Sequence, residues 1–328
     1  MKWNFKENAI LYVLVLAIIG IAVKEVLSYR SPAPMVQSTQ LAEGWKAPSL
    51  FLDGELKGEE REAVIYGNEI VANTARFFGP EGQIAHLTNG MNCQNCHLDA
   101  GKREWGNNYS AVFSTYPKFR ERSGSIESIP KRVNDCFERS LNGTALDSNS
   151  REMQAIVAYI RWLGKEVPKG KKPAGSGIVN LPYLDRAASP EKGALVYTAK
   201  CQSCHGADGQ GQIDPTAYGY AYPPLWGKNS YNTGAGMFRV SRLAGYVRDN
   251  MPFNQSSHGA PALTDGEAWD VAAFVNSQPR PVKDLSGDWP DISKKPLDHP
   301  FGPYADGFSE QQHKYGPFGP IEAARKKN

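Results

Sequence analysis

Two segments of the chain, residues 93–97 and 201–205, repeat the pattern Cys-x-x-Cys-His. In this pattern the two thiols can form thioethers to the vinyl groups of one porphyrin, and the adjacent imidazole can bind its iron. The short spacing suits this chemistry because both sulfurs and the ring must reach one macrocycle from one turn of chain. The pattern predicts two covalently bound haem c groups and a redox protein of an exported compartment. The residues concerned are Cys93, Cys96, His97, Cys201, Cys204 and His205.

A zinc site is the alternative for the first segment, since Cys93, Cys96, His97 and Cys136 have the residue types of a tetrahedral zinc centre. However, a histidine directly after the second cysteine is poorly placed to close a tetrahedron. The same pattern also recurs at 201–205, where no further cysteine follows. Both points favour haem.

The second segment has a candidate for the sixth iron ligand in Met251, which opens a Met-Pro-Phe loop. A thioether ligand stabilises reduced iron and raises its potential, which suits electron transfer. Met237 fits better as a core residue of a helix expected over 237–250, because methionine on an apolar face usually packs in the core. His258 is a weaker alternative. We therefore predict that His205 and Met251 bind the second iron.

The first segment offers a different choice. No histidine follows His97 before the linker at residue 168, and Met153 lies on the apolar stripe of an expected helix. The remaining strong ligand is Cys136, and a thiolate would lower the iron potential and suit sulfur chemistry. A buried inert cysteine fits the spacing equally well. Spacing alone leaves these two interpretations open.

The elements that must position these residues form two similar sets. Apolar residues recur at helical intervals over 59–78 and 151–163, on either side of the first motif. Ser189 before Pro190, and Thr264 three residues before Glu267, are typical of helix starts around the second motif. No run of alternating strand pattern appears. We predict an all-α fold of two tandem class I cytochrome c-like domains with long loops.

The chain divides by composition into six parts. Residues 1–27 are an N-terminal membrane anchor or signal helix, 28–57 a tether, 58–167 the first haem domain, 168–188 a linker, 189–283 the second haem domain and 284–328 an irregular C-terminal extension. Lys2 and Lys6 precede an apolar run with no good cleavage site after it. That pattern favours an uncleaved anchor on the periplasmic side over a cleaved signal. The nearly balanced charge, +3, gives no case for nucleic acid.

Several stretches of the chain resemble the dihaem thiosulfate dehydrogenases, and the likeness covers most of residues 58–283. The most discriminating is Arg-Val-Asn-Asp-Cys-Phe-Glu-Arg-Ser-Leu-Asn-Gly at 132–143. The others are residues 95–101, 223–227, 234–237 and 250–252. One departure is Asn250, because some members of the family have a lysine just before the relay methionine, where it can compete for the iron.

The resemblance implies an enzyme that couples two thiosulfate ions into tetrathionate. It implies that His97 and Cys136 ligate the catalytic iron of the first domain, while His205 and Met251 ligate a relay iron. It places Arg122, Arg132 and Ser140 in the anion-binding pocket. Fixed cations there would offset the repulsion of two dianions, and the planar fork of arginine suits a sulfonate.

The implied partners are thiosulfate or tetrathionate and a redox protein, either a cytochrome or a membrane electron-transfer complex, with no nucleic acid. Two alternative functions remain at this point. One is a tetrathionate reductase of the same architecture, and the other is a dihaem electron carrier without catalysis.

Overall fold

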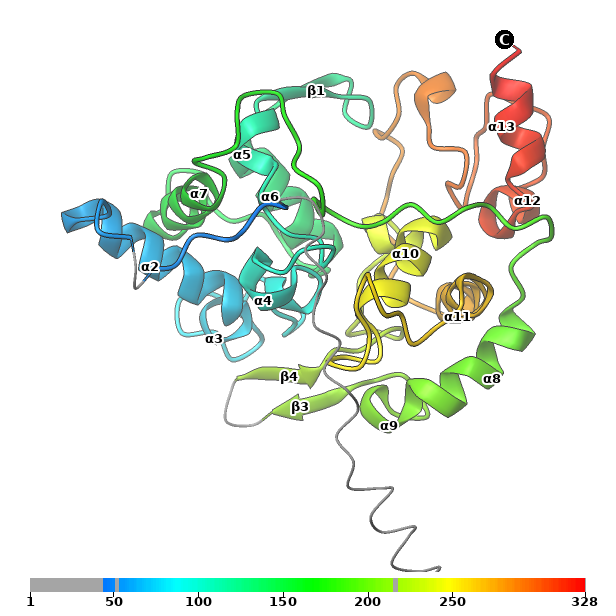
Figure 1. Cartoon of the computed structure of the whole chain (residues 1–328), viewed down its shortest axis with the longest axis horizontal. Coiled ribbons are helices and arrows are strands. Elements are labelled where there is room, and N and C mark those ends of the chain that lie inside the picture. The colour runs from blue at the N-terminus through cyan, green and yellow to red at the C-terminus, as the bar shows by residue number, and fades with distance from the viewer. Residues whose placement is uncertain (1–43, 51–52, 215–217, 328) are drawn as a thin grey trace, which may run out of the picture. The chain divides into compact units, whose positions relative to one another are not determined.

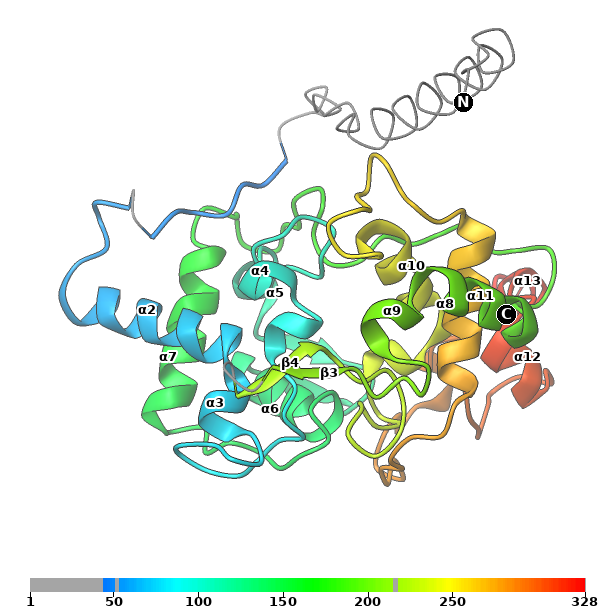
Figure 2. The same ribbon diagram turned by 90° about the horizontal axis from the view of Figure 1, so that it is seen from below.

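Helices from both sides of the first motif enclose it. The computed structural model describes residues 44–50, 53–214 and 218–327. Its first domain contains α2 (Gly58–Ala72), α3 (Thr74–Phe78), α6 (Ile129–Arg139) and α7 (Arg151–Leu163), with the short turns η1 (Cys93–Asn95), α4 (Leu98–Gly101) and α5 (Val112–Thr115) between them. Helix α2 packs across α7 (Figure 2). A Cβ atom on Gly67 would overlap the carbonyl of Ala155, so this close crossing requires glycine.

The second domain repeats this plan with α8 (Pro190–Lys200), α9 (Gln202–His205), η2 (Gly236–Phe238), α10 (Val240–Asn250) and α11 (Asp265–Ser277). Here α8 packs across α11 (Figure 1). The crossing again takes place at a glycine, because a Cβ atom on Gly193 would overlap the carbonyl of Asp270. The predicted pair of helical domains is confirmed.

The predicted helix starts agree closely with the structure. Helix α7 has the predicted bounds, and the hydroxyl of Ser189 accepts a hydrogen bond from the backbone N–H of Lys192 at 3.2 Å. Thr264 and Glu267 form the predicted capping box, in which each side chain accepts from the backbone of the other. These features are local in sequence, and the same local hydrogen bonds form in the folded chain.

Two helix predictions need correction. The helix expected over 59–78 is broken at Asn73, and the hydroxyl of Thr74 turns back to the carbonyl of Ile70 at 2.9 Å. Such side chain-to-backbone bonds compete with helix continuation. The helix expected over 237–250 begins only at Val240, because Arg239 is extended and its guanidinium pairs with buried Asp298.

The all-α prediction also missed two small antiparallel sheets. Strand β1 (Lys118–Arg120) pairs with β2 (Ser125–Glu127), with Phe119 opposite Ile126. Strand β3 (Gln212–Asp214) pairs with β4 (Gly219–Tyr222) through a bulge after Gln212. Strands of three or four residues are too short for a periodic pattern to distinguish them from loops.

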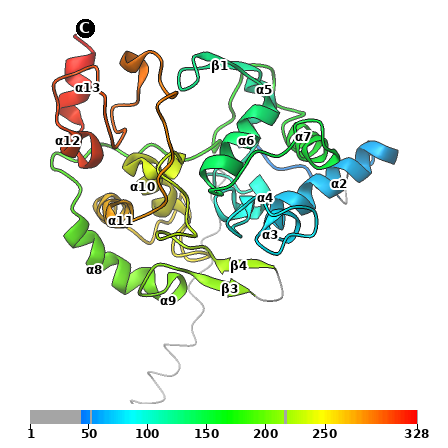
Figure 3. The same ribbon diagram turned by 180° about the vertical axis from the view of Figure 1, so that it is seen from behind.

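The C-terminal extension is more regular than predicted. It contains η3 (Ile292–Lys294) as well as α12 (Glu310–Tyr315) and α13 (Gly319–Arg325), which Figure 3 shows side by side. Ile321 of α13 is fully buried. Asp288 of the extension pairs with Arg139 of the first domain at 2.8 Å, and Asp298 pairs with Arg239 of the second domain. The extension therefore contacts both domains through acidic residues. The expectation of an irregular extension is wrong, because these helices lie within it.

The two domains pack into one compact unit from Gly44 onward. The hydroxyl of Tyr246 on α10 donates to the carbonyl of Asn95 at 2.9 Å, and the amide of Asn250 donates to the carbonyl of Trp105 at 3.0 Å. Helix α10 therefore touches the first attachment segment directly. In the described residues no helix is long and apolar enough to cross a membrane. The predicted anchor, residues 1–27, lies outside them.

Candidate active site

Hydrogen bonds from its own turn and from α3 fix the first attachment segment. The backbone N–H of Asn92 donates to Oδ1 of Asn95 at 2.7 Å, and that of Cys93 donates to the hydroxyl of Thr74 at 3.0 Å. Burial raises the pKa of the Cys93 and Cys96 thiols to about 12. Both sulfurs are thus held, uncharged, in defined positions at the protein interior.

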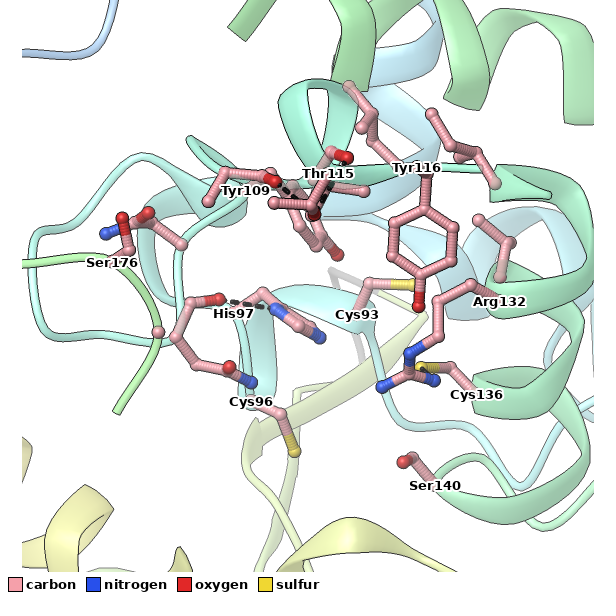
Figure 4. A pocket seen from close by; sticks show the side chains of 18 of the residues that line it. Cys93, Cys96, His97, Tyr109, Thr115, Tyr116, Arg132, Cys136, Ser140 and Ser176 are labelled. Atoms are coloured by element: carbon pink, nitrogen blue, oxygen red, sulfur yellow. Dashed lines mark hydrogen bonds between the residues drawn. The ribbon is translucent and has the colours of Figure 1, made fainter. Parts of the chain in front are cut away.

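His97 is oriented by the carbonyl of Asn107, which lies 2.5 Å from its Nδ1. Because a carbonyl can only accept, Nδ1 carries the proton and Nε2 keeps its lone pair. Figure 4 shows the ring reaching into an open space, with Tyr109 packed against it at 4.5 Å between ring centroids. Burial lowers the pKa of His97 to about 4, so the imidazole is neutral and can act as an iron ligand.

This open space is a cavity of about 530 Å³. It lies within the range of about 300–1,000 Å³ that is usual for cofactor and ligand sites. Cys93, Cys96, His97 and Cys136 all line it, although Cys136 comes from a separate helix, α6. Apolar side chains complete its walls, namely Val71, Val112, Ile129, Val133, Leu141, Ile156, Ile160 and Ile178.

These side chains fit a haem rather than a zinc ion. Nowhere in the described part of the chain do three His, Cys, Asp or Glu side chains converge closely enough to hold a metal ion. The thiols and the imidazole are instead spread around a large apolar cavity, as a flat macrocycle carrying its own iron requires. Cys136 lines the same cavity as His97, so both side chains are available to a haem bound there. The arrangement therefore favours the haem interpretation over the zinc alternative.

Arg132 and Cys136 form a close pair on one turn of α6. Nη1 of Arg132 lies 3.1 Å from Sγ of Cys136, and the nearby sulfur raises the pKa of the guanidinium. Ser140, another four residues along, also lines the cavity. Residues four apart share one face of a helix. The sequence analysis noted these three residues but did not predict α6, although Ser128 and Pro130 mark its start.

Four further cations line the cavity that the sequence analysis did not assign to the site. They are Lys118, Arg120, Lys172 and Arg242, and none of the lining residues in the described chain is acidic. Burial lowers the pKa of Lys118, and the neighbouring cations Arg120, Lys172 and Arg132 lower it further. Cations gathered in a partly buried site without carboxylates favour the binding of an anion.

A signal for two of these cations exists in the sequence. Residues 118–122 read Lys-Phe-Arg-Glu-Arg, so their charges alternate with period two, which in a strand puts them on one face. In β1 Lys118 and Arg120 face the cavity, while Phe119 is 55% exposed. The prediction of the site residues did not use this strand-like alternation.

Arg122 is not brought together with the other predicted site residues. Its Nη1 donates to the carbonyl of Gly234 at 2.9 Å, its Nε lies 3.8 Å from Asp288, and its guanidinium sits over the Trp289 ring. Burial lowers its pKa to about 10. It lines a neighbouring cavity of about 290 Å³, which shares Lys118 and Arg120 with the larger one. The structure thus groups Arg132 and Ser140 with Cys136 but places Arg122 beside them.

The second attachment segment repeats the orientation of the first. Nδ1 of His205 lies 2.9 Å from the carbonyl of Pro223, which leaves Nε2 as the free nitrogen. Burial lowers the pKa of His205 and raises that of Cys201 to about 11. Both histidines are therefore prepared in the same way for an iron.

The candidate sulfur ligands differ in their surroundings. Met251 is the residue at which α10 ends, and it is only partly buried against the core. Met237 and Met153 are buried, at 8% and 0% exposure, and Met153 does not line the first cavity. His258 binds the buried carboxylate of Asp249 at 2.7 Å and stacks on a tryptophan of the first domain, Trp105, at 3.9 Å. Met251, directly after α10 and only partly buried, remains the candidate whose thioether sulfur is available to an iron.

Comparison with known proteins identifies both domains. Residues 83–168 match the family described as SoxA/TsdA, cytochrome c domain, and residues 190–279 match the Cytochrome c family. Two relatives are named thiosulfate dehydrogenase. The protein of Stutzerimonas stutzeri is 35% identical, and the match covers 75% of this chain and 78% of the relative. The protein of Allochromatium vinosum is 36% identical, and the match covers 74% of this chain and 86% of the relative.

A third relative of the same name, from Psychrobacter arcticus, is 40% identical over 62% of this chain, and the match spans 61% of its length. A solved structure, the thiosulfate dehydrogenase TsdBA of Marichromatium purpuratum in its as-isolated form, superposes with a TM-score of 0.66 at 30% identity. The superposition covers 78% of this chain, and this chain spans about half (52%) of the solved protein.

Proposed function

Because the chain belongs to the thiosulfate dehydrogenase family and is an enzyme of that family, we propose that it oxidises two thiosulfate ions to tetrathionate. The observation that carries the proposal is the cation-lined cavity in which the sulfur of Cys136 and the guanidinium of Arg132 face the attachment segment that bears His97. The reaction balances as 2 S₂O₃²⁻ → S₄O₆²⁻ + 2 e⁻.

The first domain binds the substrate in this proposal. Cys93 and Cys96 would hold a haem c, with His97 and Cys136 as candidate iron ligands, and this group would supply a one-electron acceptor. Arg132 holds a sulfonate beside the Cys136 sulfur, and Lys118 and Arg120 offset the repulsion between two dianions brought together. The charge-assisted, two-pronged bond that an arginine can make to a sulfonate also fixes its orientation. Ser140 contributes a hydroxyl to the same face of α6.

The second domain passes the electrons on. Cys201 and Cys204 would hold a second haem c, with His205 and Met251 as candidate iron ligands, and this group would supply a second one-electron site for the two electrons of one coupling. The hydrogen bond from Tyr246 to Asn95 in the first attachment segment, together with that from Asn250 to Trp105 nearby in the first domain, supports transfer between the domains, since short bonded routes favour electron tunnelling. The final acceptor is a redox protein, a cytochrome or a membrane electron-transfer complex.

The proposed location is the periplasmic side of the cell membrane, because c-type haem attachment and the predicted N-terminal helix both point to export. Tethering by residues 1–27 is part of this proposal. Arg122, which lines the neighbouring cavity, is assigned a supporting role in attracting anions rather than in holding the reacting pair.

The test is a pair of assays on the haem-loaded protein. Thiosulfate with ferricyanide should give tetrathionate, and tetrathionate with a reduced dye should give a slower reaction. Catalytic voltammetry with both substrates measures the bias directly. A faster reduction of tetrathionate would instead make the protein a tetrathionate reductase. Absence of both reactions, together with the absence of a low-spin histidine–thiolate signal in low-temperature EPR, would make it an electron carrier and sink the proposal.

A further inference from the structure

Tyr116 has an unpaired polar group inside the active-site cavity. The residue follows α5, is 6% exposed and lines the cavity. Its hydroxyl oxygen is buried and has no hydrogen-bond partner. By contrast, the hydroxyl of Tyr159, a buried tyrosine of the same domain, donates to the carbonyl of Ala100 at 2.9 Å. A buried hydroxyl without a partner is unfavourable, so a ligand in the cavity is expected to satisfy it.

The surroundings of this hydroxyl indicate the charge of that ligand. Figure 4 shows the tyrosine ring projecting into the cavity with its hydroxyl directed toward Arg132 and Cys136. The ammonium of Lys118 lies 5.4 Å from the ring centroid. Burial raises the pKa of Tyr116, so at neutral pH the group is a protonated donor. A donor beside fixed cations matches an anionic oxygen acceptor.

We propose that the Tyr116 hydroxyl donates a hydrogen bond to a sulfonate oxygen of the sulfur oxyanion that Arg132 holds beside Cys136. This inference rests on the proposed function and deepens it by naming a second donor for the substrate. Tyr116 and Arg132 approach the site from different elements, the end of α5 and the middle of α6. Donors from two directions fix the sulfonate in orientation as well as position, which brings its outer sulfur toward a second thiosulfate.

A haem carboxylate is the other anionic oxygen that could reach such a donor. The carboxylates leave a porphyrin at its edge, whereas a cysteine that binds the iron lies over the face of the ring. The Tyr116 hydroxyl is directed toward the Cys136–Arg132 pair (Figure 4). Its position therefore favours the substrate over the haem.

The test uses Tyr116→Phe in the haem-loaded protein, with Tyr159→Phe as the matched control. Tetrathionate binding to the oxidised protein is measured by titration calorimetry, because tetrathionate is the oxidised product and does not donate electrons to the protein. KM and kcat are measured for thiosulfate. We expect Tyr116→Phe to weaken tetrathionate binding and raise KM by roughly tenfold, as for a lost hydrogen bond to a charged group. Haem content and the first haem's potential should not change.

Protein without substrate gives an independent readout. Tyr116→Phe removes an unpaired group and should leave the urea midpoint unchanged or higher, whereas Tyr159→Phe removes a made bond and should lower it while leaving KM unchanged. Unaltered KM and tetrathionate affinity in Tyr116→Phe would overturn the inference while thiosulfate oxidation by the wild type still supports the proposed function. A shifted haem potential with unaltered substrate binding would overturn it in favour of a carboxylate partner. A wild-type protein that neither binds nor turns over the anions would overturn both.

Discussion

The two attachment segments have the same local geometry but face different surroundings. In each domain a glycine lets the first helix cross the last, at Gly67 and Gly193, and in each the histidine is oriented by a backbone carbonyl. The domains differ in the helix that carries the candidate sulfur ligand of the iron. The first places α6 with Arg132 and Cys136 opposite its attachment segment, whereas the second has α10, which ends at Met251.

This difference separates haem attachment from chemistry. Attachment needs two thiols and an imidazole in one turn, and both domains provide them. A site for an anionic substrate needs cations and a reactive group on the other side of the cavity, and among the described residues only α6, β1 and the segments packed on them bring these together around an attachment segment. The second domain therefore resembles a carrier, and the first an enzyme site.

The largest expected effect comes from making the first domain resemble the second. Cys136→Met should reduce thiosulfate oxidation by at least about 100-fold, because a neutral thioether would lack the negative charge of the proposed thiolate ligand. Activity, haem content and the EPR signal of the thiolate-ligated iron are the measurements. Met153→Leu, which alters a buried sulfur outside the cavity, is the control and should retain activity. Unchanged oxidation with full haem loading would remove Cys136 from its central role.

The next effect concerns the anion pocket of the first domain. Arg132→Gln should lower kcat/KM by about 100-fold, the size expected for losing a charge-assisted hydrogen bond of about 2–3 kcal/mol. Arg132→Lys should recover part of this, because it keeps the charge and loses the planar fork. Arg122→Gln should cost less than about tenfold, since its guanidinium is bound to Gly234 and Asp288 outside this cavity. A larger loss for Arg122 than for Arg132 would contradict this placement.

The comparison predicts a redox effect in the second domain. Met251→Leu should lower the potential of the second haem by on the order of 100 mV, since a thioether stabilises reduced iron. Spectroscopic redox titration resolves the two haems, and the first should keep its potential. Met237→Leu is the matched variant, and its potential should not move. If the shift occurs in Met237→Leu instead, the ligand has been wrongly assigned.

The smallest effects test whether the two domains are energetically one unit. Ser150→Ala and Ser189→Ala each remove an N-cap hydroxyl, from α7 and α8 respectively. Each should lower the free energy of unfolding by about 1 kcal/mol. Because interdomain hydrogen bonds such as that from Tyr246 to Asn95 join the halves, both variants should show a single urea transition, followed by circular dichroism and haem absorbance together. Two separate transitions, each shifted by only one variant, would show that the domains unfold independently.

Local patterns in the sequence were sufficient to predict much of the fold. The caps at Ser189 and Thr264, the bounds of α7 and both attachment motifs depend on residues within a few positions of one another, and such contacts form wherever the chain places them. The late start of α10 was missed because it depends on a partner elsewhere in the chain, Asp298, about sixty residues after Arg239.

The sequence by itself determined the haem chemistry and the identity of the sulfur residues that could serve it, because covalent attachment needs adjacent residues. Only the tertiary structure decided which charges belong to the site. It put Lys118, Arg120, Lys172 and Arg242 around one cavity, directed Arg122 to its neighbour, and left the Tyr116 hydroxyl unpaired inside it. These residues come from elements far apart in the chain, so their meeting depends on how a hairpin, a linker and two domains pack. Spacing along the sequence does not predict how these elements pack.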